Sequence, residues 1–211
     1  MEPRIETFPA TKLIGKRLKM SFADNKTRAL AHDLLAKIAL VRHDADAARE
    51  QAALAHKADP KLALPAFVEG RLLYDQGSFA DALPFFEQAI KEQKAAAAAP
   101  MPELHYYAGD TYGRLERYPE AEAQFAAELA AFPQNIRARA GLAMLYQATE
   151  RTDAAAAAIA DMLRITPTPE SYALASRLWT MFGNRRQAEA VRADARRTFG
   201  DSARRSGSAA R

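Results

Sequence analysis

Small and large apolar residues recur along this chain with a period of about 34 residues. When the repeats are aligned on a recurrent alanine, each also has a small residue twelve positions earlier. The two series are Ala36, Gly70, Gly109, Ala143 and Ser176, and Ala48, Ala82, Ala121, Ala155 and Ala188. Bulky residues such as Leu73 and Tyr112 lie one helical turn after the first small residue. The spacing predicts closely packed pairs of helices, each helix with a fixed small face and a fixed bulky face.

Prolines and glycines interrupt the pattern where helices should end. Pro60, Pro133 and Pro167 follow the second helix of a pair, because proline cannot continue a helix. Gly77 and Gly183 fall in the tight turn between paired helices. The repeated units span approximately 29–62, 63–96, 102–135, 136–168 and 169–202. Stacked units of this kind predict an all-α helix-turn-helix solenoid.

The combination of a small residue, an aromatic, an alanine, a second aromatic and a proline at fixed positions resembles the tetratricopeptide repeat (TPR). The resemblance covers about four fifths of the chain and is strongest from Pro102 to Pro167. It implies a solenoid of about five TPR units. Arg192 replaces an aromatic in the last unit, where departures are common. Glu128 replaces a small residue in a central unit, and the pattern gives no reason for it.

The connection between the second and third units exceeds the standard period by about five residues. It contains the alanine run 95–99, and alanine is the best helix former. We therefore expect the preceding helix to continue until Pro100 stops it. A lengthened connection is the favoured interpretation, and a local change in superhelical pitch that opens a lateral site is the alternative.

The N-terminal segment has a different periodicity. Ile14, Leu18, Met20 and Phe22 alternate with polar residues at period two, which is typical of a strand. Residues 3–27 resemble the first strand of the gyrase-inhibitor-like, AraC-type effector-binding domains of bacterial regulators. The segment is interpreted as a strand-like or disordered arm, as a strand that pairs with another chain in a homo-oligomer, or as a remnant of fusion. The expected divisions are residues 1–27, a solenoid over 28–202 and a disordered basic tail over 203–211.

The net charge of +4 conceals two basic ends around an acidic middle. Residues 1–28 carry seven Lys and Arg against three Asp and Glu, and residues 177–211 carry nine against three. This distribution argues against nucleic acid as the general partner. The chain has no cysteine, no stretch resembling a membrane span and no secretory signal, so we expect a cytoplasmic protein without a membrane association.

Catalytic chemistry has no candidate residues in the sequence. The four histidines, His32, His43, His56 and His105, lack the spacing of a metal site. No phosphate-binding glycine loop, zinc-protease motif or nucleophile elbow occurs. We therefore expect a protein that is not an enzyme and that needs no cofactor or metal.

The TPR resemblance implies a concave groove lined by the first helix of each unit, which would bind a peptide or protein partner. The positions that match the family's usual contact sites are Phe67, Arg71, Tyr74, Tyr106, Asp110, Arg137, Met144 and Arg177. Aromatic, arginine and methionine side chains are enriched at protein interfaces. An alternative interpretation is that Phe67 and Tyr106 partly fill the core.

Some members of the family bind a partner's C-terminal carboxylate through lysines, asparagines and an arginine. The matching positions here include Lys37 but also Asp33 and Asp110, and no asparagine, so binding of this kind is disfavoured. Two other functions stay open: a small-molecule-responsive regulator with a truncated effector domain, and the C-terminal scaffold of a larger enzyme or regulator.

Overall fold

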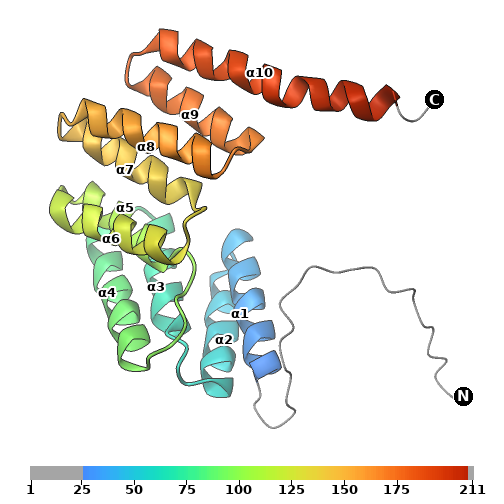
Figure 1. Cartoon of the computed structure of the whole chain (residues 1–211). Helices are drawn as coiled ribbons and strands as arrows, with labels where there is room; N and C mark the ends of the chain where they lie inside the picture. The colour runs from blue at the N-terminus through green and yellow to red at the C-terminus, as the bar shows by residue number, and fades with distance from the viewer. Residues whose placement is uncertain (1–25, 209–211) are drawn as a thin grey trace, which may run out of the picture.

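The described chain is a single array of α-helices. The structure is a computed structural model that describes residues 26–208, and the strand-like segment lies outside these residues. Within them every regular element is helical, which confirms the all-α solenoid (Figure 1). The helices are α1 (Lys26–Val41), α2 (Ala45–Ala58), α3 (Leu64–Asp75), α4 (Phe79–Ala95), α5 (Leu104–Arg114), α6 (Tyr118–Ala131), α7 (Ile136–Ala148), α8 (Thr152–Ile165), α9 (Pro169–Met181) and α10 (Arg185–Ser208).

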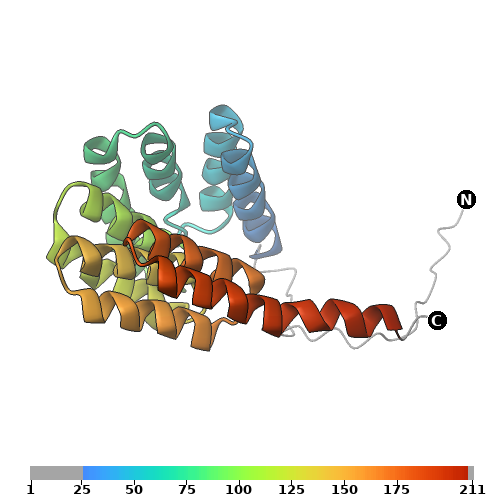
Figure 2. The same ribbon diagram turned by 90° about the horizontal axis from the view of Figure 1, so that it is seen from above.

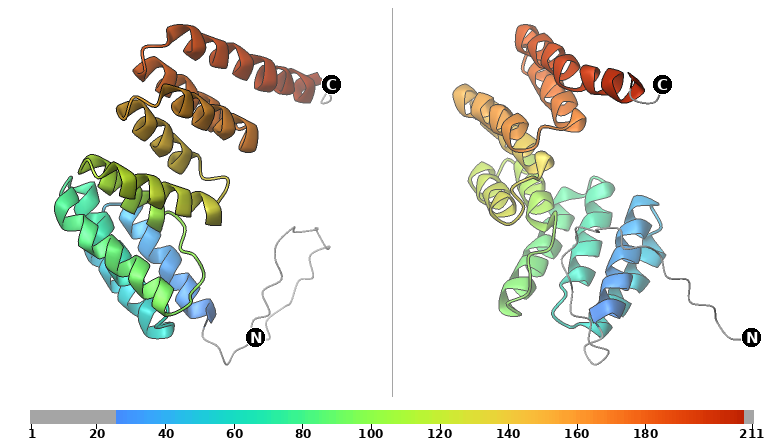
Figure 3. Two further views of the ribbon diagram at one scale, coloured as in Figure 1. Left: turned by 60° about the vertical axis from the view of Figure 1, so that its left-hand side comes forward. Right: turned by 45° about the vertical axis from the view of Figure 1, so that its right-hand side comes forward.

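Consecutive helices form five pairs that stack in chain order. The first helix of each pair packs on its own second helix, and each second helix packs on the first helix of the next pair. First helices of successive pairs also contact one another, whereas second helices of successive pairs do so at most marginally within the described chain. The array therefore curves with α1, α3, α5, α7 and α9 on its inner side. The pairs α1–α2 and α9–α10 lie at opposite ends (Figure 3).

The two series of small residues lie where paired helices approach most closely. All are buried, and aromatic rings pack directly on two of them. A Cβ added to Gly70 would lie 2.8 Å from the Phe86 ring, and one added to Gly109 would lie 2.9 Å from the Phe125 ring. Gly70 and Gly109 are therefore glycine because the ring of the second helix occupies the space of a side chain.

A left-handed residue ends the first helix in all five units. His43, Gly77, Glu116, Glu150 and Gly183 all have a φ between 58° and 80°. In each turn the following backbone N–H donates to a carbonyl five residues earlier, as from Ser78 to Leu73, which forms a Schellman motif. The sequence indicated only the two glycines among them.

The second helix of the second unit ends earlier than expected. We expected it to continue to Pro100, but α4 ends at Ala95 and the prediction is wrong. Ala97 adopts a left-handed φ of 47°, and the Ala98 N–H donates to the Gln93 carbonyl in another Schellman motif. Met101 is buried in the core, and its N–H donates to the Gln93 side chain over 2.8 Å. Burial of Met101 outweighs the helix propensity of the alanine run.

Glu128 has a structural role that the repeat pattern did not show. Its carboxylate is fully buried and accepts hydrogen bonds from the backbone N–H groups of Glu103 and Tyr106, at 2.9 and 3.3 Å. The side-chain amide of Asn135 donates to it over 2.8 Å. Glu103 precedes α5 and supplies no side-chain cap, while Asn135 caps α7. Glu128 therefore satisfies the N-terminal donors of α5 and joins the starts of two groove helices.

The last helix is longer than the repeat requires. α10 continues to Ser208 and extends past its neighbours (Figure 2), beyond the expected boundary at residue 202. Alanine and arginine, which make up 12 of the 24 residues of α10, are strong helix formers. Among the described helices, none combines the length and apolarity needed to cross a bilayer.

Candidate binding groove on the first helices

An aromatic cluster centred on Tyr107 lies where α3, α4 and α5 pack together. We define the aromatic cluster as Phe67, Tyr74, Phe86, Tyr106 and Tyr107. The Tyr107 ring is 4.9 Å from Tyr106 and 5.1 Å from Tyr74, both edge to face, and 6.2 Å from Phe67 and from Phe86. Tyr107 is only 4% exposed. Edge-to-face contacts stabilise aromatic pairs beyond their buried area, so the cluster forms a rigid floor.

Three arginines lie around this cluster. Arg71 of α3 places its guanidinium 3.9 Å from the centre of the Tyr107 ring, and Arg137 of α7 lies 5.2 Å from Tyr106. Arg114 of α5 lies 5.6 Å from Tyr74. These distances are those of cation–π contacts, which hold the guanidinium groups over the ring faces.

Carboxylates fix the arginines in place. Arg71 pairs with Asp75 at 3.0 Å, and Arg137 pairs with Glu103 at 2.9 Å. Arg137 also donates to the Tyr107 hydroxyl over 3.2 Å. The buried Nε of Arg71 has no hydrogen-bond partner among the described residues.

A hydrogen-bonded relay joins the groove faces of α3 and α5. The Tyr74 hydroxyl donates to Oδ2 of Asp110 at 2.5 Å, and Nε of Arg114 donates to the same oxygen at 2.6 Å. Burial, followed by the hydrogen bond to Asp110, raises the pKa of Tyr74. Burial, followed by the Asp110 charge, raises the pKa of Tyr106 to about 12. Both phenols are therefore neutral near pH 7, and Tyr74 acts as a donor.

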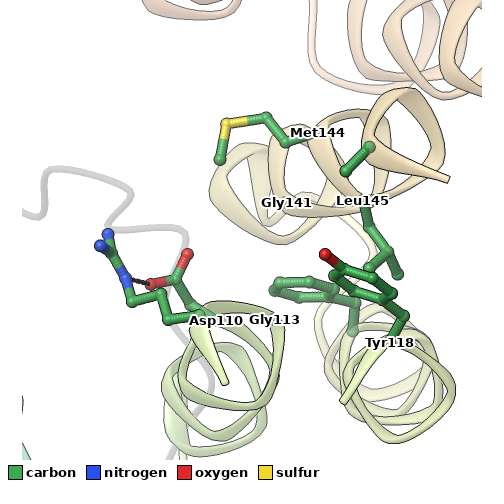
Figure 4. A pocket seen from close by; sticks show the side chains of 9 residues that line it. Asp110, Gly113, Tyr118, Gly141, Met144 and Leu145 are labelled. Atoms are coloured by element: carbon green, nitrogen blue, oxygen red, sulfur yellow. Dashed lines mark hydrogen bonds and ion pairs between the residues drawn. The ribbon is translucent and has the colours of Figure 1, made fainter. Parts of the chain in front are cut away.

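A cavity of about 250 Å³ opens beside the relay, between α5, α6 and α7 (Figure 4). Asp110 lies on one side of it and Met144 on the other, and Arg114, the ion-pair partner of Asp110, also lines it. The remaining lining is mostly apolar and consists of Gly113, Tyr118, Phe125, Gly141, Leu145 and Ala148. A cavity of this size and lining can accommodate one apolar side chain, with a charged pair at its edge.

The structure distributes the expected groove residues over three places. Arg71, Tyr74, Tyr106 and Arg137 gather at the aromatic cluster, while Asp110 and Met144 meet at the cavity. Phe67 is 2% exposed and supports the floor from within the core. Arg177 lies apart, beside a second cavity of about 680 Å³ between α9 and α10.

Sequence reasoning missed Tyr107, Arg114 and Tyr118. Tyr107 follows Tyr106 directly, and only its alignment with the buried Val68 of the preceding unit indicated an inward position. Arg114 is one helical turn after Asp110, a spacing that favours the ion pair observed.

Two of the histidines take part in contacts between paired helices. Nδ1 of His32 lies 2.7 Å from Gln51, and Nδ1 of His105 lies 2.6 Å from Gln124, at equivalent places in two units. Among the side chains that the structure describes, no group of three or more His, Cys, Asp and Glu residues is arranged to hold a metal ion.

These features define a helical-repeat solenoid with an arginine-covered aromatic cluster on its inner helices and a cavity beside it. A family model for the tetratricopeptide repeat matches residues 114–178. This match supports the resemblance to the tetratricopeptide repeat that the sequence pattern indicated.

Solved structures of the same fold cover most of the chain. MamA (residues 41-end) from Desulfovibrio magneticus RS-1 is 16% identical with a TM-score of 0.56, and the match covers 80% of this chain and 93% of that one. YrrB, described as a TPR protein with an unusual peptide-binding site, is 18% identical with a TM-score of 0.52, covering 82% and 88%. The type IV pilus biogenesis factor PilW is 21% identical with a TM-score of 0.59, covering 84% and 80%. No curated protein matches the chain.

Proposed function

We propose that this protein is a noncatalytic scaffold that binds a segment of another protein along the inner face of α3, α5 and α7. The main support for this proposal is that an apolar cavity adjoins the aromatic cluster and its three arginines. Contact residues in this proposal are Arg71, Tyr74, Tyr106, Asp110, Arg137 and Met144. Arg177 extends the same face toward α9, and Phe67 supports the floor.

The chemistry of the groove favours an extended or helical segment with one apolar anchor. The anchor enters the cavity beside Met144, which is 39% exposed and thus accessible. Around the anchor, Arg71 and Arg137 offer donors to carbonyl or carboxylate groups of the segment. The nearby Asp75, Glu103 and Asp110 balance the arginines, so charge alone does not select the partner.

Preorganisation supports recognition of a peptide. The arginines and tyrosines are already held by ion pairs, ring contacts and hydrogen bonds, so little side-chain entropy is lost when the segment binds. One protein of the same fold, YrrB, is described by its peptide-binding site. The proposal transfers that kind of function, without its ligand, to the present groove.

A charge placed in the cavity tests the proposal. We expect Met144→Glu to abolish capture of the principal partner, because a carboxylate would be desolvated next to Asp110. Met181→Glu is the matched control, because Met181 is 69% exposed on α9 and outside the cavity. Proteins captured by affinity purification are quantified by mass spectrometry for both variants. A partner that both variants retain equally would place binding elsewhere and reject the groove.

A second variant tests the arginine cover. Arg137→Ala removes the guanidinium from Tyr106 and Tyr107 without altering the cavity lining. We expect affinity for the captured partner to fall by about 10-fold or more, as for a central interface arginine. Arg164→Ala, on the exposed surface of α8, should leave affinity unchanged.

A further inference from the structure

One face of α1 is apolar and uncovered in the described chain. Leu30, Leu34, Ile38 and Val41 follow one side of the helix, with Leu35 beside them, and all are 46% exposed or more. We call these five residues the α1 face. Spacings of four, four and three residues place such side chains in one stripe along a helix. Isolated exposed apolar residues are common, but a contiguous stripe marks a contact surface.

The residues at the equivalent repeat positions of later units are buried in contacts between units. One unit later, Leu30, Leu34 and Ile38 correspond to Leu64, Val68 and Leu72 of α3, which are all buried. Equivalent positions to Ile38 in the later units are Thr111, Leu145 and Leu178, and these are buried too. In each later unit the second helix of the preceding unit packs on the first helix. The α1 face is therefore a stacking face that lacks its cover among the described residues.

We propose that residues 18–22 of the same chain cover the α1 face. In an extended conformation, Leu18, Met20 and Phe22 would share one side of this segment, and Lys19 and Ser21 would share the other. The next residue on the apolar side is Lys16, so the apolar run ends at Leu18. The three apolar side chains match the α1 face, while Lys19 and Ser21 stay in water. The peptide groups of an extended segment point sideways, so water can satisfy them while one side is buried.

Chain connectivity favours this occupant. Residue 22 is separated from Lys26, the first residue of α1, by Ala23, Asp24 and Asn25. Asp and Asn are favoured in turns, so the segment can reverse direction and run back along α1. A tether this short gives an effective concentration on the order of millimolar.

The length of residues 18–22 also agrees with the stripe on α1. The whole helix has 16 residues and a length of about 24 Å, and Leu18 to Phe22 spans about 13 Å when extended. From Leu30 to Ile38 the helix rises about 12 Å, the length of about four extended residues. The resulting register pairs Phe22 with Leu30, Met20 with Leu34 and Leu18 with Ile38.

A second copy of the chain is a weaker occupant. The α1 face is about 24 Å long and about 10 Å wide, so two copies would bury roughly 500 Å² in total. Stable protein interfaces bury about 1,200 Å² or more. An intramolecular cover does not need that area, because the segment is already attached.

Disulfide trapping in the full chain tests the proposal, since the natural sequence contains no cysteine. One variant combines Met20→Cys with Leu34→Cys, and its matched control combines Lys19→Cys with Leu34→Cys. The two variants share the cysteine at position 34, and their other cysteines are one residue apart. In the proposed register, the cysteine at position 20 faces α1 and the cysteine at position 19 faces away. Under mild oxidation at low protein concentration, we expect the Met20 variant to form the intramolecular disulfide at least about 10-fold faster, because only it satisfies disulfide geometry.

Equal rates in the two variants, or no disulfide in either, would overturn the proposal. A predominantly intermolecular disulfide would show that a second copy covers the face instead. Leu18→Cys with Ile38→Cys is a second pair in the same register and should behave as the Met20 pair does. Light scattering of the unmodified full chain should give a monomer, and a dimer would contradict the intramolecular cover. None of these measurements depends on the groove or on its partner.

Discussion

The third unit, α5–α6, and the last unit, α9–α10, have different contacts at the same two repeat positions. In the third unit the Phe125 ring packs on Gly109, and Gly141 of the next unit lies against the same ring. In the last unit Arg192 stands at the place of Phe125, and Ser176 stands at the place of Gly109. Nε of Arg192 donates to the Ser176 hydroxyl over 2.7 Å. A ring on a glycine is thus replaced by a hydrogen bond between side chains.

The difference between Phe125 and Arg192 follows from whether another helix covers the residue. α7 covers Phe125, whereas no described helix covers Arg192, and the place opens into the cavity lined by Arg177, Arg192 and Arg196. An exposed phenylalanine there would leave apolar surface in water. The contact between a small and a large residue within a unit is therefore required only where a following helix buries it.

The largest expected effect contrasts the two residues of this comparison. Phe125→Ala leaves a cavity between Gly109 and Gly141 and should lower the free energy of unfolding by about 3–5 kcal/mol. Arg192→Ala removes one hydrogen bond from an exposed side chain and should cost about 0.5–1.5 kcal/mol. Urea unfolding of both variants, followed by circular dichroism, gives the two values. Equal losses would mean that the contact of Arg192 with Ser176 stabilises the last unit as much as the contact of Phe125 with Gly109 stabilises the third.

Glu128 provides the next comparison, because its counterpart in the last unit is Ala195. Glu128→Ala places alanine at this position in the third unit as well. The backbone N–H groups of Glu103 and Tyr106 and the side-chain amide of Asn135 then lose their acceptor. We expect the free energy of unfolding to fall by about 2–4 kcal/mol. Hydrogen exchange should show the first turn of α5 losing protection.

A matched control lies on the same helix. Glu122 of α6 is partly exposed and pairs with Arg151 at 2.7 Å. Glu122→Ala should cost less than about 1 kcal/mol, as exposed ion pairs do. If Glu122→Ala and Glu128→Ala cost the same, the buried cap is not the source of the effect.

The smallest expected effect concerns the turn within each unit. Glu116 and Gly183 occupy the same left-handed position, with φ values of 60° and 77°. Glu116→Gly should stabilise the protein by up to about 1 kcal/mol, because glycine adopts this conformation without strain. Gly183→Ala should destabilise it by about 1 kcal/mol through the backbone alone, since nothing lies within 4 Å of the added Cβ. Thermal unfolding gives the change in Tm for each variant. A change of the same sign in both would contradict the expected opposite effects.

The groove shows where sequence reasoning reached its limit. The TPR resemblance implied Arg71, Tyr74, Tyr106 and Arg137, and the structure gathers them around Tyr107. The sequence left open whether Phe67 contacts a partner or fills the core, because its burial depends on contacts with Phe86 of α4 and Tyr107 of α5. Whether the gathered residues contact a partner stays a prediction.

The periodicity of the sequence is enough to specify the helical pairs, their register and the all-α solenoid. Small residues, prolines and turn glycines act within about one unit of chain, so their spacing carries this information directly. The tertiary structure alone decided the cap provided by Glu128, the end of α4 at Ala95 and the pairing of Arg192 with Ser176. Each of these depends on whether a helix from elsewhere in the array covers the residue. Burial of that kind is set by the stacking of whole units, and local periodicity does not encode it.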